Sequence, residues 1–304
     1  MKSLLVHWLV GVGLRCLGCG STAIEAYDEN LVKRQLNLTQ ASYCVTPESP
    51  VWACGTCSEG VTLEAVVQDE GHLGASGALA LVGFDSCSSG CGGKGGALFV
   101  SYRGSSNVEN WLENIKVVKT GPYSDMPDVK VEDGFWQWYK SLKAGVDAAL
   151  LAASLKHANA TEVSVSGHSA GGAAATLHAF DLTRGDAHAT AQGKLRLRQL
   201  VTFGSPRVGN EDFFEAFEQL INETAVPSWR VTHWHDTVPH VIPEAMGFHH
   251  VATEVWYNEA SSTRLVCDES GEDPKCSNTC GPFQCTSIPD HLDYLNTSLG
   301  LDGC

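Results

Sequence analysis

The sequence is poor in basic residues. Among its 304 residues, lysine and arginine together number 20, whereas aspartate and glutamate number 35, which gives a formal net charge of -15 at pH 7. Proteins that bind nucleic acid or anionic membranes by electrostatic attraction need clustered lysine and arginine. The composition therefore argues against both classes of partner and leaves neutral, apolar or zwitterionic ligands open.

The sequence also lacks long hydrophobic runs, internal repeats and low-complexity tracts. Its beginning holds a lysine, a short apolar run and then small residues, a pattern typical of a secretory signal that is cleaved near Ala23. This run is too short to span a bilayer, and no later segment comes near that length. We therefore expect residues 1–23 to be a signal peptide and residues 24–304 to form a single soluble domain with one large core.

Cysteine, by contrast, is abundant, with 12 residues in the chain. Cys16 and Cys19 would leave with the signal peptide, so an even number would remain. Several of the others lie a few residues apart, which suits local disulfides that persist in an oxidising compartment. A zinc site at Cys54-x-x-Cys57 is the alternative, but there is no second pair at a finger-like distance. The close pairs are Cys54 with Cys57, Cys87 with Cys91, Cys267 with Cys276, and Cys280 with Cys285.

Two further features bear on secretion and processing. Four Asn-x-Ser/Thr triplets agree with an extracellular glycoprotein. The dibasic Lys33–Arg34 is compatible with propeptide cleavage and with a solvated helix face, and the sequence leaves both open. The triplets begin at Asn37, Asn159, Asn222 and Asn296.

Segments typical of strands alternate with segments typical of helices. This alternation predicts an α/β fold with a central, mostly parallel sheet and helices on both faces. Reactive groups in such folds lie at the carboxyl ends of the strands. We expect strands at residues 63–67, 78–84, 96–104, 162–166, 199–206 and 229–239, the last leading into a loop. We expect helices at residues 134–158, 170–182 and 210–221, with Asn210 capping the last.

The stretch EVSVSGHSAGGAAATLHAF, residues 162–180, contains one such strand end. Alternating β-branched residues give way to an alanine-rich helix, with little room for the turn between them. Gly167 and Gly171 lie two residues to either side of Ser169, and glycine permits a positive φ and a close backbone approach. This is the G-x-S-x-G pattern of the α/β-hydrolase nucleophile elbow, which holds a serine hydroxyl above the sheet. Ser169 is therefore the candidate nucleophile.

A serine nucleophile needs a histidine to take its proton and an acid to fix that histidine. In α/β-hydrolases both partners follow the serine in the chain. Asp236 comes where the strand WRVTHWH ends and is the candidate acid, with a capping aspartate as the alternative. Spacing alone favours a base in GFHH, near the acid. Six histidines follow the serine, namely His233, His235, His240, His249, His250 and His291.

Six segments, in this order, resemble the secreted fungal class 3 lipases. They are FVSYRGSSNVENWLENI, VSGHSAGG, TFGSPRVGN, RVTHWHDTVPHVIP, GFHHVATEVWY and DHLDYL, and the resemblance covers nearly all of residues 44–304. It implies an α/β-hydrolase fold in which Ser169 is the nucleophile, Asp236 the acid and His291, in DHLDYL, the base. His250 matches a histidine that recurs in the family without acting as the base.

The resemblance also implies an oxyanion hole. Acyl transfer needs N–H donors aimed at the oxyanion that develops during the reaction. One is the N–H of Ala170, directly after the nucleophile, and the other is that of Ser105, directly after the RG that ends a strand; a simple turn serine is the alternative for Ser105. The family usually has leucine at the Ala170 position, so we expect the N–H to be retained and the acyl pocket to be reshaped.

The segment NVENWLENI predicts a short helix with one apolar stripe. Periodicity alone favours an ordinary core-facing helix. The resemblance instead implies a lid over residues 106–114, which would cover the site in water and open at a lipid surface. The stripe consists of Val108, Trp111, Leu112 and Ile115.

The resemblance further implies three disulfides. These join Cys44 to Cys304, Cys54 to Cys57, and Cys267 to Cys276. Four other cysteines are additional to the commonest family pattern, and their pairing is expected from proximity alone. They are Cys87, Cys91, Cys280 and Cys285.

Together these features predict a secreted, extracellular serine hydrolase that cleaves acylglycerol esters through an acyl-enzyme. We expect a monomer that acts at an oil–water interface and needs no cofactor or metal. A feruloyl esterase or phospholipase of the same fold is the alternative, and the apolar stripe favours a lipase. A lipid-binding protein without catalysis would not need a serine, an acid and a histidine together. A metal site could use His233, His235, Asp236 and His240, but no H-E-x-x-H or comparable ligand set is present.

Overall fold

The computed structural model describes residues 26–69, 77–87, 96–185, 195–280 and 284–304. The predicted signal peptide, residues 1–23, lies outside them. None of the described helices is long and apolar enough to cross a membrane.

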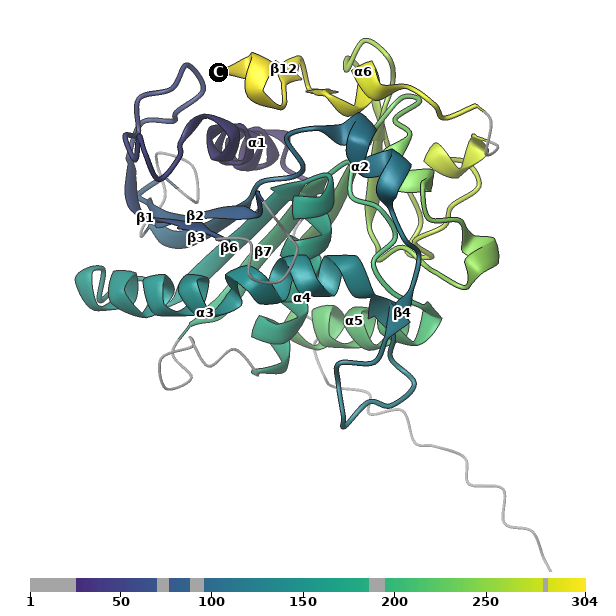
Figure 1. The fold of residues 1–304 in the computed structure, drawn as a ribbon, viewed down its shortest axis with the longest axis horizontal. Coiled ribbons are helices and arrows are strands. Elements are labelled where there is room, and N and C mark those ends of the chain that lie inside the picture. The colour runs from purple at the N-terminus through teal and green to yellow at the C-terminus, as the bar shows by residue number, and fades with distance from the viewer. Residues whose placement is uncertain (1–25, 70–76, 88–95, 186–194, 281–283) are drawn as a thin grey trace, which may run out of the picture.

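A central eight-stranded sheet organises the described part of the chain, in the order β1-β2-β3-β6-β7-β8-β9-β10 (Figure 1). The strands from β3 to β9 pair in parallel, and both edges of the sheet are antiparallel. The mostly parallel sheet predicted from the sequence is therefore present. The strands are β1 (Val61–Gln68), β2 (Leu79–Asp85), β3 (Ala97–Tyr102), β6 (Glu162–His168), β7 (Arg196–Phe203), β8 (Ser228–His233), β9 (Glu254–Tyr257) and β10 (Arg264–Val266).

Helices cover both faces of the sheet (Figure 1). One face packs against α1, and the other packs against α3, α4 and α5 in the largest hydrophobic cluster. The alternation of β6 follows from this arrangement, because Val163 and Val165 belong to the large cluster whereas Ser166 bonds to Thr39 of α1 at 3.1 Å. These helices are α1 (Glu29–Cys44), α3 (Asp133–Lys156), α4 (Ala170–Arg184) and α5 (Glu211–Thr224).

Helix α4 is alanine-rich because it is the central helix of its layer. Its residues from Ala170 to Leu182 are all buried, so only small side chains allow the close approach of sheet and helix. Helix α5 is amphipathic instead, and Asn210 caps it as predicted, accepting the N–H of Phe213 at 3.1 Å.

Short elements connect this framework. They are α2 (Val108–Asn114), β4 (Lys119–Thr120), β5 (Val131–Glu132), η1 (Val238–His240), η2 (Glu244–Met246), η3 (Ser277–Thr279), α6 (Ile288–His291), β11 (Asp293–Tyr294), β12 (Thr297–Ser298) and η4 (Leu301–Gly303).

Four disulfides link described residues, and each pairing agrees with the expectation. The Cys44–Cys304 bridge joins the end of α1 to the last residue of the chain. Cys91, the expected partner of Cys87, lies outside the described residues. The other bridges are Cys54–Cys57, Cys267–Cys276 and Cys280–Cys285.

The structure also places the processing and glycosylation candidates. Lys33 and Arg34 lie within α1, where Lys33 pairs with Glu29 and Arg34 with Asp85. The pair is therefore part of a packed helix, and Arg34 faces the sheet rather than solvent. Asn37 also lies within α1, and Thr39 of its triplet is fully buried. The remaining candidates are exposed, at Asn159, Asn222 and Asn296.

Candidate active site

Ser169 occupies the turn between β6 and α4, with φ 58° and ψ -132°. Only glycine fits at the positions two residues before and two residues after it. A Cβ on Gly167 would lie 2.2 Å from the carbonyl oxygen of Gly171, and one on Gly171 would lie 2.3 Å from that of Tyr102. Positive φ at a non-glycine residue costs conformational energy and is often found at functional sites. The geometry is that of a nucleophile elbow.

Asp236 and His291 form a buried pair. Nδ1 of His291 lies 2.9 Å from Oδ2 of Asp236, and the hydroxyl of Tyr294 donates to the same oxygen. The backbone N–H of Val238 donates to Oδ1 at 2.8 Å. Burial alone would raise the pKa of Asp236, but the His291 imidazole and these donors hold it below its ordinary value. Asp236 is therefore held as a carboxylate that orients the imidazole through Nδ1.

The other nitrogen of His291 is left open. Among the described residues, neither Nε2 of His291 nor Oγ of Ser169 has a hydrogen-bond partner, although both residues are fully buried. His168, which precedes the serine, stacks on the His291 ring with centroids 4.4 Å apart. A buried polar atom without a partner costs about 1–3 kcal/mol, so such atoms call for an explanation. The serine and histidine do not bond to each other here, but both keep the atom that catalysis would use.

The end of β7 packs tightly against Asp236 and His291. Gly204 has φ +54°, and a Cβ there would lie 2.6 Å from Oδ2 of Asp236 and 2.8 Å from Nδ1 of His291. The loops that follow β6, β7 and β8 thus converge at the carboxyl edge of the sheet, as the sequence predicted.

Ser105 and Ala170 each carry a backbone N–H for which no acceptor exists in the described ranges. Ala170 is fully buried at the first position of α4. The Ser105 hydroxyl turns back to the backbone of Asn107, so only its N–H is open. A Cβ on Gly104 would lie 2.8 Å from Cβ of Ser169, which shows how closely this loop approaches the elbow. Two N–H groups near Ser169 are available to a ligand oxygen.

Helix α2 begins three residues after Ser105. Asn107 caps it by accepting the N–H of Asn110 at 2.8 Å. Val108 is buried, and Trp111 packs on Phe135 with ring centroids 6.1 Å apart. The other two stripe residues, Leu112 and Ile115, are partly buried, and Ile115 lies just beyond the helix as its C-cap, so the predicted helical stripe is one residue too long.

His250 lies apart from the pair formed by Asp236 and His291. Its Nε2 is 2.9 Å from the carbonyl oxygen of Pro239, and its backbone N–H donates to the Glu272 carboxylate at 2.9 Å. Glu272 in turn binds Arg207 through two hydrogen bonds. The contacts of His250 therefore hold Pro239, in the segment that follows Asp236.

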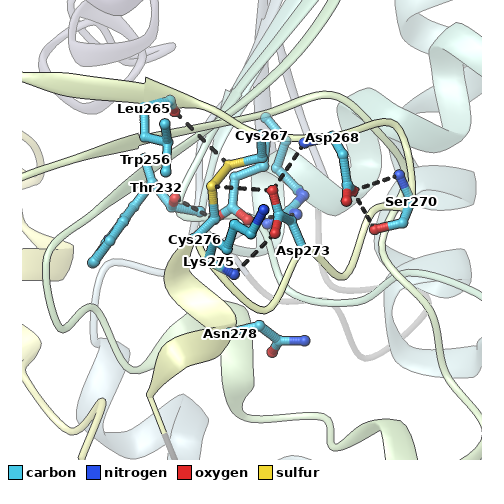
Figure 2. The surroundings of a disulfide bond; sticks show 12 residues. Thr232, Trp256, Leu265, Cys267, Asp268, Ser270, Asp273, Lys275, Cys276 and Asn278 are labelled. Atoms are coloured by element: carbon cyan, nitrogen blue, oxygen red, sulfur yellow. Dashed lines mark hydrogen bonds and ion pairs between the residues drawn. A yellow bond between two sulfur atoms is a disulfide. The ribbon is translucent and has the colours of Figure 1, made fainter.

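The alternative metal set does not assemble. Both ring nitrogens of His233 face backbone carbonyl oxygens, those of Asp290 and Glu259, at 3.1 Å each. The His235 ring stacks on Trp234 at 4.4 Å, and Asp236 is committed to His291. Within the described ranges, the group that could geometrically hold a metal is Glu254 with Cys267 and Cys276, whose sulfurs form the disulfide shown in Figure 2. A disulfide sulfur cannot act as the thiolate ligand that such a site needs.

Three polar residues at the site were missed by sequence reasoning. Tyr294 binds Asp236, and Tyr43 and His168 form a buried hydrogen-bonded pair behind the elbow. Tyr294 and His168 left a signal, since they lie in the segments DHLDYL and VSGHSAGG, whereas Tyr43 lies far from both in the sequence.

Comparison with known proteins gives consistent matches. The sequence model described as "Lipase (class 3)" matches residues 99–246. The lipase of Rhizomucor miehei is 34% identical over 67% of this chain and 53% of that protein. Secreted mono- and diacylglycerol lipase 1 of Fusarium solani is 38% identical over 52% of this chain and 43% of that protein. The chain thus spans about half the length of the curated relatives that it matches.

A solved structure extends the match. It is described as "A serine protease triad forms the catalytic centre of a triacylglycerol lipase" and superposes with a TM-score of 0.74 at 30% identity, over 90% of this chain and 96% of that chain. The fold and the elbow together define an α/β-hydrolase. Within that class, the chain belongs to the class 3 lipase family.

Proposed function

We propose that this protein is a secreted serine hydrolase that cleaves acylglycerol esters through an acyl-enzyme. The observation that carries the proposal is the Asp236–His291 pair, because its imidazole keeps Nε2 open and stacks on His168, the residue before Ser169. The names of its relatives, lipase and mono- and diacylglycerol lipase, support the same substrate class.

The chemistry follows from the open atoms. His291 Nε2 takes the hydroxyl proton of Ser169 as Oγ attacks the ester carbonyl carbon, and the carbonyl oxygen becomes an oxyanion. The N–H groups of Ser105 and Ala170 stabilise that oxyanion. Asp236 holds the imidazole by Nδ1 and stabilises it once it is protonated.

The acyl-enzyme then forms and is consumed with balanced proton transfers. The imidazolium gives its proton to the alcohol oxygen as the ester C–O bond breaks, which releases the alcohol and leaves the acyl group on Ser169. Water next loses a proton to His291 and attacks the acyl carbon. The same proton returns to Oγ as the fatty acid leaves.

Access to Ser169 requires movement, because the serine is fully buried. We propose that residues 106–114 form a lid that opens at a lipid surface. Opening into water would expose the packed side chains of Val108 and Trp111, at about 25 cal/mol per Å² of apolar area. Contact with lipid removes this cost, so an apolar α2 favours acylglycerols over soluble feruloyl esters.

The disulfides support an extracellular location for the protein. Four bridges join described residues, and disulfides of this number persist in an oxidising compartment. The word "secreted" in the name of the Fusarium solani relative agrees with this.

A substrate series tests the proposal. We expect hydrolysis of tributyrin and a mono- or diacylglycerol, with a sharp rise in rate as tributyrin passes its solubility limit. Trp111→Ser should blunt the rise while leaving hydrolysis of dissolved ester within about twofold. Leu155→Ser is the matched control, because Leu155 is an exposed leucine on α3, far from α2 in sequence.

Two results would overturn the parts of this proposal separately. Turnover of methyl ferulate or phosphatidylcholine without turnover of acylglycerols would reassign the substrate. A rate curve with no break at the solubility limit, unchanged by Trp111→Ser, would remove the lid.

A further inference from the structure

Tyr43, near the end of α1, connects the two segments that carry the proposed oxyanion donor and nucleophile. Its side chain is buried, and its hydroxyl accepts the N–H of Gly104 at 3.1 Å. The same hydroxyl lies 2.6 Å from Nδ1 of His168. Nε2 of His168 lies 2.8 Å from the carbonyl oxygen of His291. One chain of hydrogen bonds therefore runs from Gly104 through two side chains to the backbone of the proposed base.

The donors and acceptors in this chain have a single consistent assignment. The Gly104 N–H can only donate, and the His291 carbonyl oxygen can only accept. Nε2 of His168 must therefore carry the proton, which leaves Nδ1 of the neutral ring as an acceptor. The Tyr43 oxygen accepts a hydrogen bond from the Gly104 N–H, and its O–H group donates a hydrogen bond to Nδ1 of His168. Every link is satisfied in one direction.

Burial keeps both side chains in the protonation states that this assignment needs. Burial lowers the pKa of His168 well below its ordinary value, and the neighbouring His291 imidazole lowers it further, so the ring is neutral. Burial raises the pKa of Tyr43, so its hydroxyl keeps its proton. Both side chains are therefore neutral near neutral pH.

This chain of hydrogen bonds touches the site at its two ends, Gly104 and His291, and through His168 between them. Gly104 precedes Ser105, whose N–H is the proposed oxyanion donor, and His168 precedes Ser169. We propose that Tyr43 and His168 are positioning residues, which fix the oxyanion loop, the nucleophile elbow and His291 at the mutual distances that hydrolysis requires. This inference rests on the function proposed above, because positions matter here only if Ser169 and His291 react.

The anchoring of Tyr43 fits this role. The next residue, Cys44, is bonded to Cys304, and the side chain of Gln40 holds both the N–H and the carbonyl oxygen of Gly300. The anchoring residues, Gly300 and Cys304, lie in the same C-terminal segment as His291. The end of α1 is thus fixed to the part of the molecule that carries the proposed base.

A second buried pair provides a matched control. The hydroxyl of Tyr102 lies 3.0 Å from Nδ1 of His178, and both side chains are buried as deeply as those of Tyr43 and His168. This pair lies in the hydrophobic layer with α3 and α4, and Nε2 of His178 has no partner in the described part of the chain. Its side chains make no hydrogen bond to the Gly104 loop or to His291. The two pairs share their chemistry and differ in what they connect.

The experiment measures kcat and KM on p-nitrophenyl butyrate below its solubility limit, together with the urea midpoint of each variant. Tyr43→Phe should lower kcat by about 10- to 100-fold with KM within about twofold, since small misplacements of oxyanion donors act on the transition state. Tyr102→Phe should lower the urea midpoint comparably and leave kcat within about twofold.

A second variant breaks the same contact from its other side. His168→Gln can still donate from its amide to the His291 carbonyl but loses the acceptor for Tyr43, so its kcat should fall as in Tyr43→Phe. The double variant should be scarcely worse than either single one, because both remove one link. His168→Gln also serves if Tyr43→Phe does not fold.

Three results decide the matter. If Tyr43→Phe and His168→Gln fold and keep kcat within twofold of the wild type, the positioning role is wrong. Losses that add in the double variant would also contradict it. Ser169→Ala is assayed alongside, and full activity in that variant would overturn the proposed function itself rather than the positioning role.

Discussion

His291 and His250 are two buried histidines that contact the segment from Asp236 to Pro239, the first at Asp236 and the second at Pro239. They differ in the partners of their ring nitrogens. His291 gives Nδ1 to the carboxylate of Asp236 and keeps Nε2 open. His250 spends Nε2 on the carbonyl oxygen of Pro239, and its backbone is held by Glu272. The nearer histidine in sequence is thus the one whose nitrogen is already used.

The partners of the two imidazoles separate the reactive histidine from the supporting one. Both rings are buried, so burial does not distinguish them. Their hydrogen-bond partners distinguish them. His291 binds a carboxylate through Nδ1 and has no partner at Nε2 among the described residues, whereas Nε2 of His250 lies against a backbone carbonyl oxygen. A buried polar atom without a partner is costly, and His291 Nε2 is oriented by a fully bonded acid.

Replacement of the two histidines should give the largest contrast. His291→Ala should reduce kcat by about three to six orders of magnitude, because the base is lost. His250→Ala should keep kcat within about tenfold and lower the free energy of unfolding by about 1–3 kcal/mol, because the carbonyl oxygen of Pro239 loses its hydrogen bond with the imidazole. Steady-state kinetics and urea unfolding measure the two effects.

The comparison would fail if the outcomes were exchanged. A dead His250→Ala beside an active His291→Ala would place the base in GFHH, where sequence spacing alone favours it. Ser169→Ala combined with His291→Ala should be scarcely worse than either variant, since members of a triad act as a unit.

A smaller effect concerns stability against pH. Burial, with Arg230 and Arg207 nearby, lowers the pKa of His250 well below its ordinary value, and burial lowers that of His178 to about 3. A histidine whose pKa is lowered by folding contributes stability above its unfolded pKa of about 6.5, and this is lost as pH falls. Each such residue should therefore lower the free energy of unfolding by about 1.4 kcal/mol per pH unit between pH 6 and 5.

Glu218 acts in the opposite direction. Burial raises its pKa to about 7, so it contributes stability at low pH that is lost as pH rises through 7. Urea unfolding at pH 5 and pH 6 should show a shallower pH dependence in His250→Asn and a steeper one in Glu218→Gln. Slopes equal to that of the wild type in both variants would refute the assignment of these two groups.

Much of the framework could be predicted from local patterns. Glycines two residues before and after a serine, between a β-branched strand and an alanine-rich segment, predicted the turn at Ser169 because only a tight turn needs that arrangement. Cys280 and Cys285 were paired from proximity alone, since they lie 5 residues apart in the sequence. The choice of His291 over His250 came from the family resemblance, and the contact with Asp236 agrees with it.

The supporting contacts could not be predicted, because they join residues far apart in the chain. Tyr43 and His168 are 125 residues apart, and no local pattern links the end of α1 to the end of β6. Their contact depends on how α1 packs on the sheet. The end of the apolar stripe was missed for a related reason, since Ile115 leaves the helix where the chain turns toward β4.

The most direct test of the central claim is covalent labelling by a fluorophosphonate probe, with the labelled residue identified by mass spectrometry. We expect about one probe per molecule, attached to Ser169 in the peptide that contains SGHSAGG, with no labelling of Ser169→Ala and slow labelling of His291→Ala. Labelling of a different serine, or ester hydrolysis that continues in Ser169→Ala without labelling, would contradict it.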